Sequence, residues 1–340
     1  MHMLEPETVA NTTANVTSKP FASYTSEKMR LGIVGLGKMG GNLALQAVEK
    51  NIAVIGKARS TKPDLERNGV KVVRDYESFV SYLDIPRVIY LSLPAGPTID
   101  TVLKEMLPYL ERGDVVMDGG NSFYMDSIKR EKELFDKGIY FLDCGTSGGL
   151  EGARYGACFM VGGRAEGIKI AEHILKTLAV NEDGYVCTGQ PGSGHFVKLV
   201  HNGIEFGMLQ SIGEGVSLLL QGNGFNLDLV QIFKNWSNGS VIRGWLVELM
   251  EKGLREQDYG KIPSYIEDTG EVNWLVEDAI NKEIPIPVIS QSVMELFKSR
   301  SKDSDAYKSI ALMRHGFGGH PFGKDENIKK ERKTSRITRT

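Results

Sequence analysis

The chain has 340 residues, 41% of them hydrophobic and 25% charged, which is enough for two domains with substantial cores. Its 41 basic and 43 acidic residues give a formal net charge of −2, so charge provides no general attraction to nucleic acid or to an anionic membrane. Three widely spaced cysteines, Cys144, Cys158 and Cys187, favour free thiols in a reducing, cytoplasmic compartment over a disulfide framework.

Residues 1–28 are rich in Ser and Thr and contain no apolar run of the kind found in secretion signals. We expect a disordered leader there. Elsewhere, no apolar run reaches the roughly 18 to 20 residues that a membrane-spanning helix needs. The sequence therefore predicts neither a membrane protein nor a secreted one.

From residue 29 to residue 194, short apolar runs alternate with amphipathic stretches, which is typical of βαβ units. The first unit joins Leu31–Val34 and Ala53–Ile55 through a helix-like stretch at Asn42–Lys50. Later strand-like runs are Val88–Ser92, Val115–Met117, Tyr140–Leu142 and Phe159–Val161, and amphipathic stretches include Thr98–Leu110 and Met125–Lys137. The pattern predicts an α/β, Rossmann-type doubly wound sheet over residues 29–194.

After the glycine-rich turn Gly189–Gly194, strand signals largely stop and long segments with helical periodicity follow. These segments are Phe196–Leu220, Leu227–Asn235, Leu246–Arg255, Trp274–Asn281 and Ile286–Ser299. We therefore expect an all-helical domain over residues 195–322. Residues 323–340 are polar and basic, and we expect a weakly ordered tail.

A G-x-G-x-x-G pattern follows the first predicted strand and opens the first predicted helix, which is the context expected of a dinucleotide site. Its residues are Gly35, Leu36, Gly37, Lys38, Met39 and Gly40. Glycines allow a tight turn and let a pyrophosphate approach the free N–H groups at the helix N-terminus. The alternative is a glycine-rich turn without a ligand.

The end of the second predicted strand bears on the choice of cofactor. NAD enzymes usually carry Asp or Glu there for the ribose 2′-hydroxyl, but this chain has Ala58 flanked by Lys57, Arg59 and Ser60. These donors could hold a 2′-phosphate, which favours NADP over NAD. The alternative is that the two basic residues are solvated loop charges and that the protein uses either cofactor.

Four polar residues after the interdomain turn have helical spacing. Lys198, His201, Asn202 and Glu205 fall at i, i+3, i+4 and i+7, so a helix would present all four on one face. A solvated face with a charge pair is one explanation. The position at a junction between two domains favours a catalytic face instead, because ligand clefts commonly form at such junctions.

Four motifs, spread over about residues 31–320, resemble those of 6-phosphogluconate dehydrogenases. The run that begins Gly194-His195-Phe196-Val197-Lys198 and ends at Glu205 is the most specific of them. The others are Asp118-Gly119-Gly120-Asn121-Ser122, Gly145-Thr146-Ser147-Gly148-Gly149 with Glu151–Gly156, and Arg314-His315-Gly316-Phe317-Gly318-Gly319-His320. The resemblance implies oxidative decarboxylation of 6-phosphogluconate to ribulose 5-phosphate and CO2, with NADP or NAD and no metal.

The resemblance also implies residue roles. Lys198 would be the general base and Glu205 the acid, while Asp118 would serve turn geometry. Contacts to the substrate hydroxyls and carboxylate would come from Asn121, Ser147, Gly148, Gly149, His201 and Asn202, with Asn121 also near the cofactor. Cations for the phosphate would be Arg243, Arg314 and His320, the last two supplied by a neighbouring subunit of a homodimer or homotetramer.

Two departures from the family pattern leave phosphate binding open. Phe206 stands where a phosphate-binding tyrosine is common, and residues 268–274 replace the familiar G-T-G-K-W stretch. Two other readings also remain at this point. One is a different β-hydroxyacid dehydrogenase, such as a 3-hydroxyisobutyrate or glyoxylate-type enzyme, and the other is a catalytically silent NADP-binding regulator.

Overall fold

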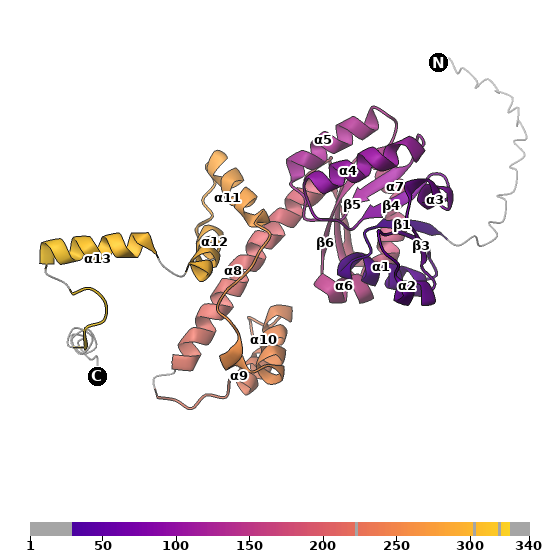
Figure 1. Cartoon of the computed structure of the whole chain (residues 1–340). Helices are drawn as coiled ribbons and strands as arrows, with labels where there is room; N and C mark the ends of the chain where they lie inside the picture. Colours follow the sequence, from indigo (N-terminus) through magenta and orange to yellow (C-terminus); the bar gives the residue numbers. More distant parts are fainter. Residues whose placement is uncertain (1–28, 222–223, 302–303, 319–320, 327–340) are drawn as a thin grey trace, which may run out of the picture.

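The structure is a computed structural model that describes residues 29–221, 224–301, 304–318 and 321–326. A sheet-based region is followed by a helical region, and the long helix α8 (Ser193–Gln221) belongs to both (Figure 1). The expected order of a doubly wound sheet and then an all-helical domain is confirmed. The leader expected at 1–28 lies outside the described residues, as does the part of the expected tail beyond residue 326.

The described residues form one sheet of eight strands in the order β3-β2-β1-β4-β5-β6-β7-β8. All neighbouring strands pair in parallel except β6 and β7, which are antiparallel. The strands are β1 (Arg30–Val34), β2 (Ala53–Lys57), β3 (Lys71–Val73), β4 (Val88–Leu91), β5 (Val115–Asp118), β6 (Tyr140–Ser147), β7 (Cys158–Gly162) and β8 (Tyr185–Gly189). The strand order reverses between β1 and β4, where such sheets open a crevice for ligands.

Helices cover both faces of the sheet, which is why its central strands are continuous apolar runs. Residues of α1 and α7 pack with one face, and residues of α3, α4 and α5 pack with the other. The helices of this region are α1 (Lys38–Glu49), α2 (Pro63–Arg67), α3 (Tyr76–Ser81), α4 (Pro97–Met106), α5 (Tyr124–Phe135), α6 (Gly149–Tyr155) and α7 (Ala165–Leu178). The two apolar layers hold the carboxyl ends of the strands in a fixed arrangement.

The helical region begins along α8, whose first turns pack against β6 and β7. The helices that follow are α9 (Leu229–Ser237), α10 (Trp245–Glu256), α11 (Glu271–Asn281), α12 (Pro287–Arg300) and α13 (Asp305–Gly318). In Figure 1, α9 and α10 lie near the far end of α8, α11 and α12 lie nearer its middle, and α13 extends away from the rest. Within the described segments, no helix combines the length and apolarity required to cross a membrane.

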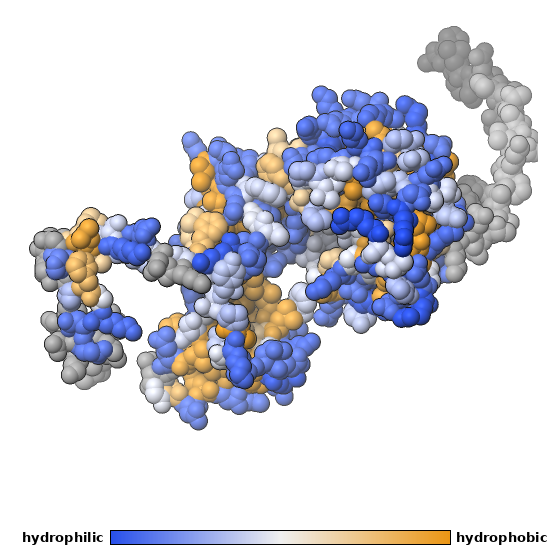
Figure 2. All heavy atoms as spheres, viewed as in Figure 1, coloured by the Kyte–Doolittle hydropathy of each residue, from blue (hydrophilic) through white to orange (hydrophobic). Residues whose placement is uncertain are grey.

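The core of the helical region is small. One cluster centres on buried Leu199, Val272, Leu275 and Val293, and another on Val216, Phe233 and Val247. Figure 2 shows hydrophobic residues on the outer surface near α8, α9 and α10. Large exposed apolar side chains of this region are Leu209, Leu218, Ile242, Trp245 and Leu249, and all of these except Leu218 line the cavity described below.

Candidate active site

A cavity of about 2430 Å³ runs from the carboxyl edge of the sheet along α8 to α9 and α10. Gly37, Lys38 and Met39 line its sheet end. Gly35 and Gly40 instead make the turn itself. A Cβ on Gly35 would lie 2.3 Å from the Ser92 carbonyl oxygen, and one on Gly40 would lie 2.0 Å from the Gly35 oxygen. Larger residues are therefore excluded from this turn by backbone contact.

The N-terminus of α1 fits a dinucleotide pyrophosphate. Gly37 is its N-cap and provides no side-chain cap, so the first N–H groups of this helix of 12 residues are available to a ligand. A Cβ on Gly37 would have nothing within 4 Å, which leaves open space where a phosphate would lie. Free N–H groups and the helix dipole both favour an anion there. Leu36 is buried beneath the turn.

The residues expected to choose between NADP and NAD lie at the end of β2. Ala58 is buried, whereas Arg59 and Ser60 are exposed. The Lys57 ammonium lies over the Tyr76 ring, 4.1 Å from its centroid. None of the four lines the main cavity among the described residues, so their part in cofactor choice stays a prediction.

Helix α8 starts at a fixed point in the sheet region because Asp143 caps it. The Asp143 carboxylate accepts hydrogen bonds from the backbone N–H of Gly192 at 2.7 Å and of His195 at 2.8 Å. The buried His195 ring bridges the Ser127 hydroxyl at 2.7 Å and the Asp118 carbonyl oxygen at 3.0 Å. The first turn is thus anchored to β5, α5 and β6, and Lys198 follows it directly.

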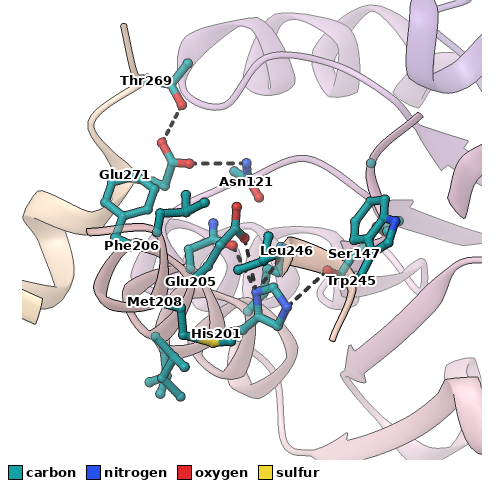
Figure 3. Close-up of a pocket in the computed structure, with 18 of the residues that line it drawn as sticks. Asn121, Ser147, His201, Glu205, Phe206, Met208, Trp245, Leu246, Thr269 and Glu271 are labelled. Carbon is teal, nitrogen blue, oxygen red and sulfur yellow. Dashed lines mark hydrogen bonds and ion pairs between the residues drawn. The ribbon is translucent and has the colours of Figure 1, made fainter. Parts of the chain in front are cut away.

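The four polar residues predicted to share one face of α8 do so. Figure 3 shows two of them, His201 and Glu205, side by side. His201 Nδ1 lies 3.4 Å from Lys198 Nζ, 3.2 Å from Asn202 Oδ1 and 3.8 Å from Glu205 Oε2. Its Nε2 lies 3.1 Å from the hydroxyl of Ser147, the last residue of β6. All of these side chains line the cavity. Lys198 and Asn202 are buried, whereas the side chains of His201 and Glu205 are each 40% exposed.

Lys198 has the electrostatic setting of a base. It is 7% exposed, and burial lowers the pKa of its ammonium below the ordinary value, while the charge of Glu205 opposes part of that shift. Burial and the neighbouring Lys198 charge also lower the pKa of His201. A lowered pKa favours the neutral amine, which is the form of lysine that can accept a proton.

The loops at the carboxyl ends of β5 and β6 complete the wall opposite α8. Asn121 follows β5, and Ser147, Gly148 and Gly149 join β6 to α6; all four line the cavity. Gly148 and Gly149 have φ angles of 110° and 60°, which favour glycine. Asp118 is buried and accepts from the Gly120 N–H and the Ser122 hydroxyl, in agreement with its expected role in turn geometry.

Comparison with known proteins places this site in a family. Residues 30–189 match the NAD binding domain of 6-phosphogluconate dehydrogenase, and residues 194–337 match the C-terminal domain of that enzyme. The Bacillus subtilis protein YqeC, which carries the same enzyme name, is 40% identical over 295 residues, or 86% of this chain and 98% of the relative. This chain belongs to the 6-phosphogluconate dehydrogenase family.

Two further family members differ in their cofactors. A Haloferax volcanii relative named as an NAD-dependent decarboxylating enzyme is 36% identical over 306 residues, covering 88% of this chain and 100% of the relative. A solved structure of the Plasmodium falciparum enzyme, described with NADP and with 6-phosphogluconate, has a TM-score of 0.74 at 27% identity. That match covers 88% of this chain and 67% of the other. Both cofactors therefore occur among its relatives.

The structure separates the three cations expected to bind phosphate. Arg243 is exposed, lines the cavity and donates to the Ser240 carbonyl oxygen at 3.1 Å. Arg314, on α13, is exposed and does not line the described cavity of its own chain. His320 lies outside the described residues. Within one chain, Arg243 thus lines the same cavity as the polar face of α8, and Arg314 does not.

Sequence reasoning missed several residues of the cavity. The wall formed by α9 and α10, including Trp236, Trp245 and Leu246, had only helical periodicity as a signal. Glu271, at the start of α11, also lines the cavity and lies opposite Lys198. The departure from the family motif over residues 268–274 pointed to this segment, but not to a buried carboxylate. Phe206, the other departure, lines the cavity as well.

Proposed function

We propose that this chain oxidises and decarboxylates 6-phospho-D-gluconate to D-ribulose 5-phosphate and CO2, with reduction of NADP or NAD. The observation that carries the proposal is the polar face of α8, where Lys198, His201, Asn202 and Glu205 gather beside a dinucleotide turn. Membership of the family supports the same reaction. The reaction belongs to the pentose phosphate pathway.

Oxidation at C3 of the substrate requires the hydroxyl proton and a hydride to leave. Lys198 is the base for the proton, because its burial favours the neutral amine. The nicotinamide ring, when bound, accepts the hydride. The product of this step is a 3-keto acid, and Lys198 is left as an ammonium.

The ketone lies β to the C1 carboxylate, so it can accept the electron pair when that carboxylate leaves as CO2. The Lys198 ammonium stabilises the enolate oxygen that forms at C3. Glu205 then donates a proton to the carbon that becomes C1 of ribulose 5-phosphate. His201 lies between the two groups, within 3.4 Å of Lys198 and 3.8 Å of Glu205, and orients both.

Contacts to the rest of the sugar acid come from both walls of the cavity. The proposed set is Asn121, Ser147, Gly148, Gly149, His201 and Asn202. Their amide, hydroxyl, imidazole and backbone groups supply donors and acceptors within a largely apolar cavity, which is how small-molecule sites fix the orientation of a ligand. His201 and Glu205 favour this reaction over that of other β-hydroxyacid dehydrogenases, which give no reason for either residue.

The phosphate requires cations, and we infer that a second subunit supplies some of them. Arg243 is in place within one chain. Helix α13 extends away from its own chain in Figure 1 and exposes Tyr307, Leu312 and Met313. Docking of α13 on a neighbour would cover these side chains and bring Arg314 and His320 to the neighbour's phosphate site. The proposed assembly is thus a homo-oligomer, a dimer or tetramer.

We place the protein in the cytoplasm, because Cys144, Cys158 and Cys187 are all free thiols. Free thiols are usual in a reducing compartment.

The test is to measure NADPH or NADH formation and CO2 release together on purified protein with 6-phosphogluconate. We expect one CO2 per reduced cofactor, and little turnover of gluconate or 3-hydroxyisobutyrate. Reduced cofactor without CO2 would indicate a simple hydroxyacid dehydrogenase. Cofactor binding without turnover of any of the three acids would indicate a silent regulator.

A further inference from the structure

Glu271 is a buried carboxylate in the cavity for which the proposed reaction gives no role. It is 9% exposed and lies in the first turn of α11, in the segment that departs from the family motif. Burying a carboxylate is costly unless hydrogen bonds or opposite charges compensate. Its surroundings therefore indicate what it does.

Three interactions stabilise the Glu271 carboxylate. The Thr269 hydroxyl donates a hydrogen bond to Oε2, and the amide nitrogen of Asn121 lies 3.5 Å from Oε1. The N-terminus of α11, capped by Gly270 without a side chain, adds the favourable end of a helix dipole. Thr269 belongs to the helical region, whereas Asn121 belongs to the sheet region. Glu271 therefore links the two sides of the cleft (Figure 3).

The contact with Glu271 determines how the Asn121 side chain is oriented. An ionised carboxylate only accepts hydrogen bonds, so the amide nitrogen of Asn121 must face it. The amide oxygen consequently points away from Glu271, into the cavity, as Figure 3 shows. Asn121 then offers a ligand an acceptor, suited to a hydroxyl of the sugar acid or to an amide N–H of the nicotinamide.

Glu271 also faces Lys198. A small cavity of about 10 Å³ lies between them, and Asn121 and Asn202 line it too. The charged and titratable groups around Lys198 are His201 and Glu205 on α8, Cys158 on β7 and Glu271 on α11. Burial lowers the pKa of Lys198, and the charge of Glu205, then of Cys158 and of Glu271, opposes that effect. Glu271 is the contribution from α11.

We propose that Glu271 is a positioning residue of the active site, which orients the Asn121 amide across the cleft and sets the charge opposite Lys198. The inference rests on the proposed function and adds a residue to it. Its two effects separate by substitution. Glu271→Gln keeps the shape and an acceptor oxygen but removes the charge. Glu271→Asp keeps the charge but withdraws the carboxylate from Asn121 by one methylene.

The charge is tested by NMR titration of the Lys198 side chain in protein labelled with ¹³C-lysine, which requires no turnover. The Lys198 signal is assigned by its loss in Lys198→Met. In Glu271→Gln we expect the Lys198 pKa to fall, because one of the negative charges that oppose the effect of burial is lost. Glu277→Gln, on an exposed position of the same helix, is the matched control and should leave it unchanged. An unchanged Lys198 pKa in Glu271→Gln would overturn this half of the proposal.

The orientation of Asn121 is tested by a double-mutant cycle on kcat/KM for 6-phosphogluconate. Glu271→Asp alone should lower kcat/KM about tenfold, the usual effect of losing one hydrogen bond to a charged group. In an Asn121→Ala background, the same substitution should cost nothing further, because the partner is already absent. Full additivity of the two losses would overturn this half.

The wild-type assay separates this inference from the proposed function. If wild-type protein does not turn over 6-phosphogluconate, the proposed reaction fails, and the lysine titration still decides whether Glu271 sets the charge opposite Lys198. If wild-type protein is active and both variants behave as wild type in titration and cycle, the reaction stands and the role of Glu271 is wrong.

Discussion

The sheet region and the helical region bury their apolar side chains to different extents. In the sheet region, two large clusters join residues from both faces of the sheet, and the central strands are fully buried. In the helical region, the described clusters centre on four and on three buried residues, and large apolar side chains remain exposed on α8, α10 and α13. The sheet region therefore covers its apolar side chains more completely than the helical region does.

This difference also separates the tasks of the two regions. The sheet region holds the dinucleotide turn and fixes the start of α8, so the proposed base Lys198 is positioned by the more completely packed half. The helical region supplies the apolar wall and Arg243, the cation proposed for the phosphate, in the half that exposes more apolar surface. Catalysis should therefore depend on the junction, stability on the sheet region and assembly on the helical region.

The largest effect on turnover should come from a substitution in α8, where the sheet region meets the helical region. Lys198→Ala should lower kcat by about 10²- to 10⁴-fold, the range for general acid–base catalysis, with cofactor affinity unchanged. Lys169→Ala, on an exposed face of α7, is the control. Because the base must be neutral, kcat/KM of the wild type should rise with pH and then level off. The midpoint of that rise should lie below the ordinary pKa of lysine. More than about a tenth of wild-type turnover in Lys198→Ala would contradict the assigned base.

Core substitutions test the comparison directly. Phe79 is fully buried beneath the sheet. Phe79→Ala should lower the free energy of unfolding by about 3–5 kcal/mol, because the substitution leaves a cavity. Leu312→Ala, on exposed α13, should change it by less than about 1 kcal/mol. Urea denaturation measures both, at a concentration where the protein is monomeric. Equal losses would mean that the helical region is as completely packed as the sheet region.

Cofactor choice should belong to the sheet region alone. We expect a higher kcat/KM with NADP than with NAD, and Ala58→Asp should reverse the order by roughly 10- to 100-fold, because a carboxylate repels a 2′-phosphate. Ala58→Ser, which adds no charge, serves as the control. Equal efficiency with both cofactors in the wild type would show that Lys57, Arg59 and Ser60 do not select.

The smallest signal, a partial recovery of activity, tests whether the helical region is completed by a partner. Inactive Lys198→Ala and Arg314→Ala chains should regain about a quarter of wild-type activity when co-expressed as a dimer. In a mixed dimer, one site carries both lesions and the other carries neither. Mixtures no more active than the two parents would place Arg314 in the site of its own chain.

The sequence predicted the central strands and the long helices because their apolar patterns reflect burial on one or two faces. It did not predict β3 and β8, which are partly exposed edge strands, the first with three residues. It also did not predict the bounds of α13. The apolar side chains of that helix are exposed, so they show no buried face. Local spacing correctly predicted that Lys198 and His201 share a helix face. No local pattern pointed to Glu271, because its partner Asn121 lies 150 positions away and only the fold brings them together.

Helix α8 has 29 residues and, at 1.5 Å per residue, is about 43 Å long. It runs without a break from the sheet region into the helical region, so no loop joins the two regions at this point. Its stiffness is uneven. Gly213 and Gly215 have no neighbour within 4 Å of an added Cβ, and glycines without a packing role weaken a helix. Bending should therefore concentrate beyond Glu205, so that the far helices can move while the base keeps its alignment with the dinucleotide turn.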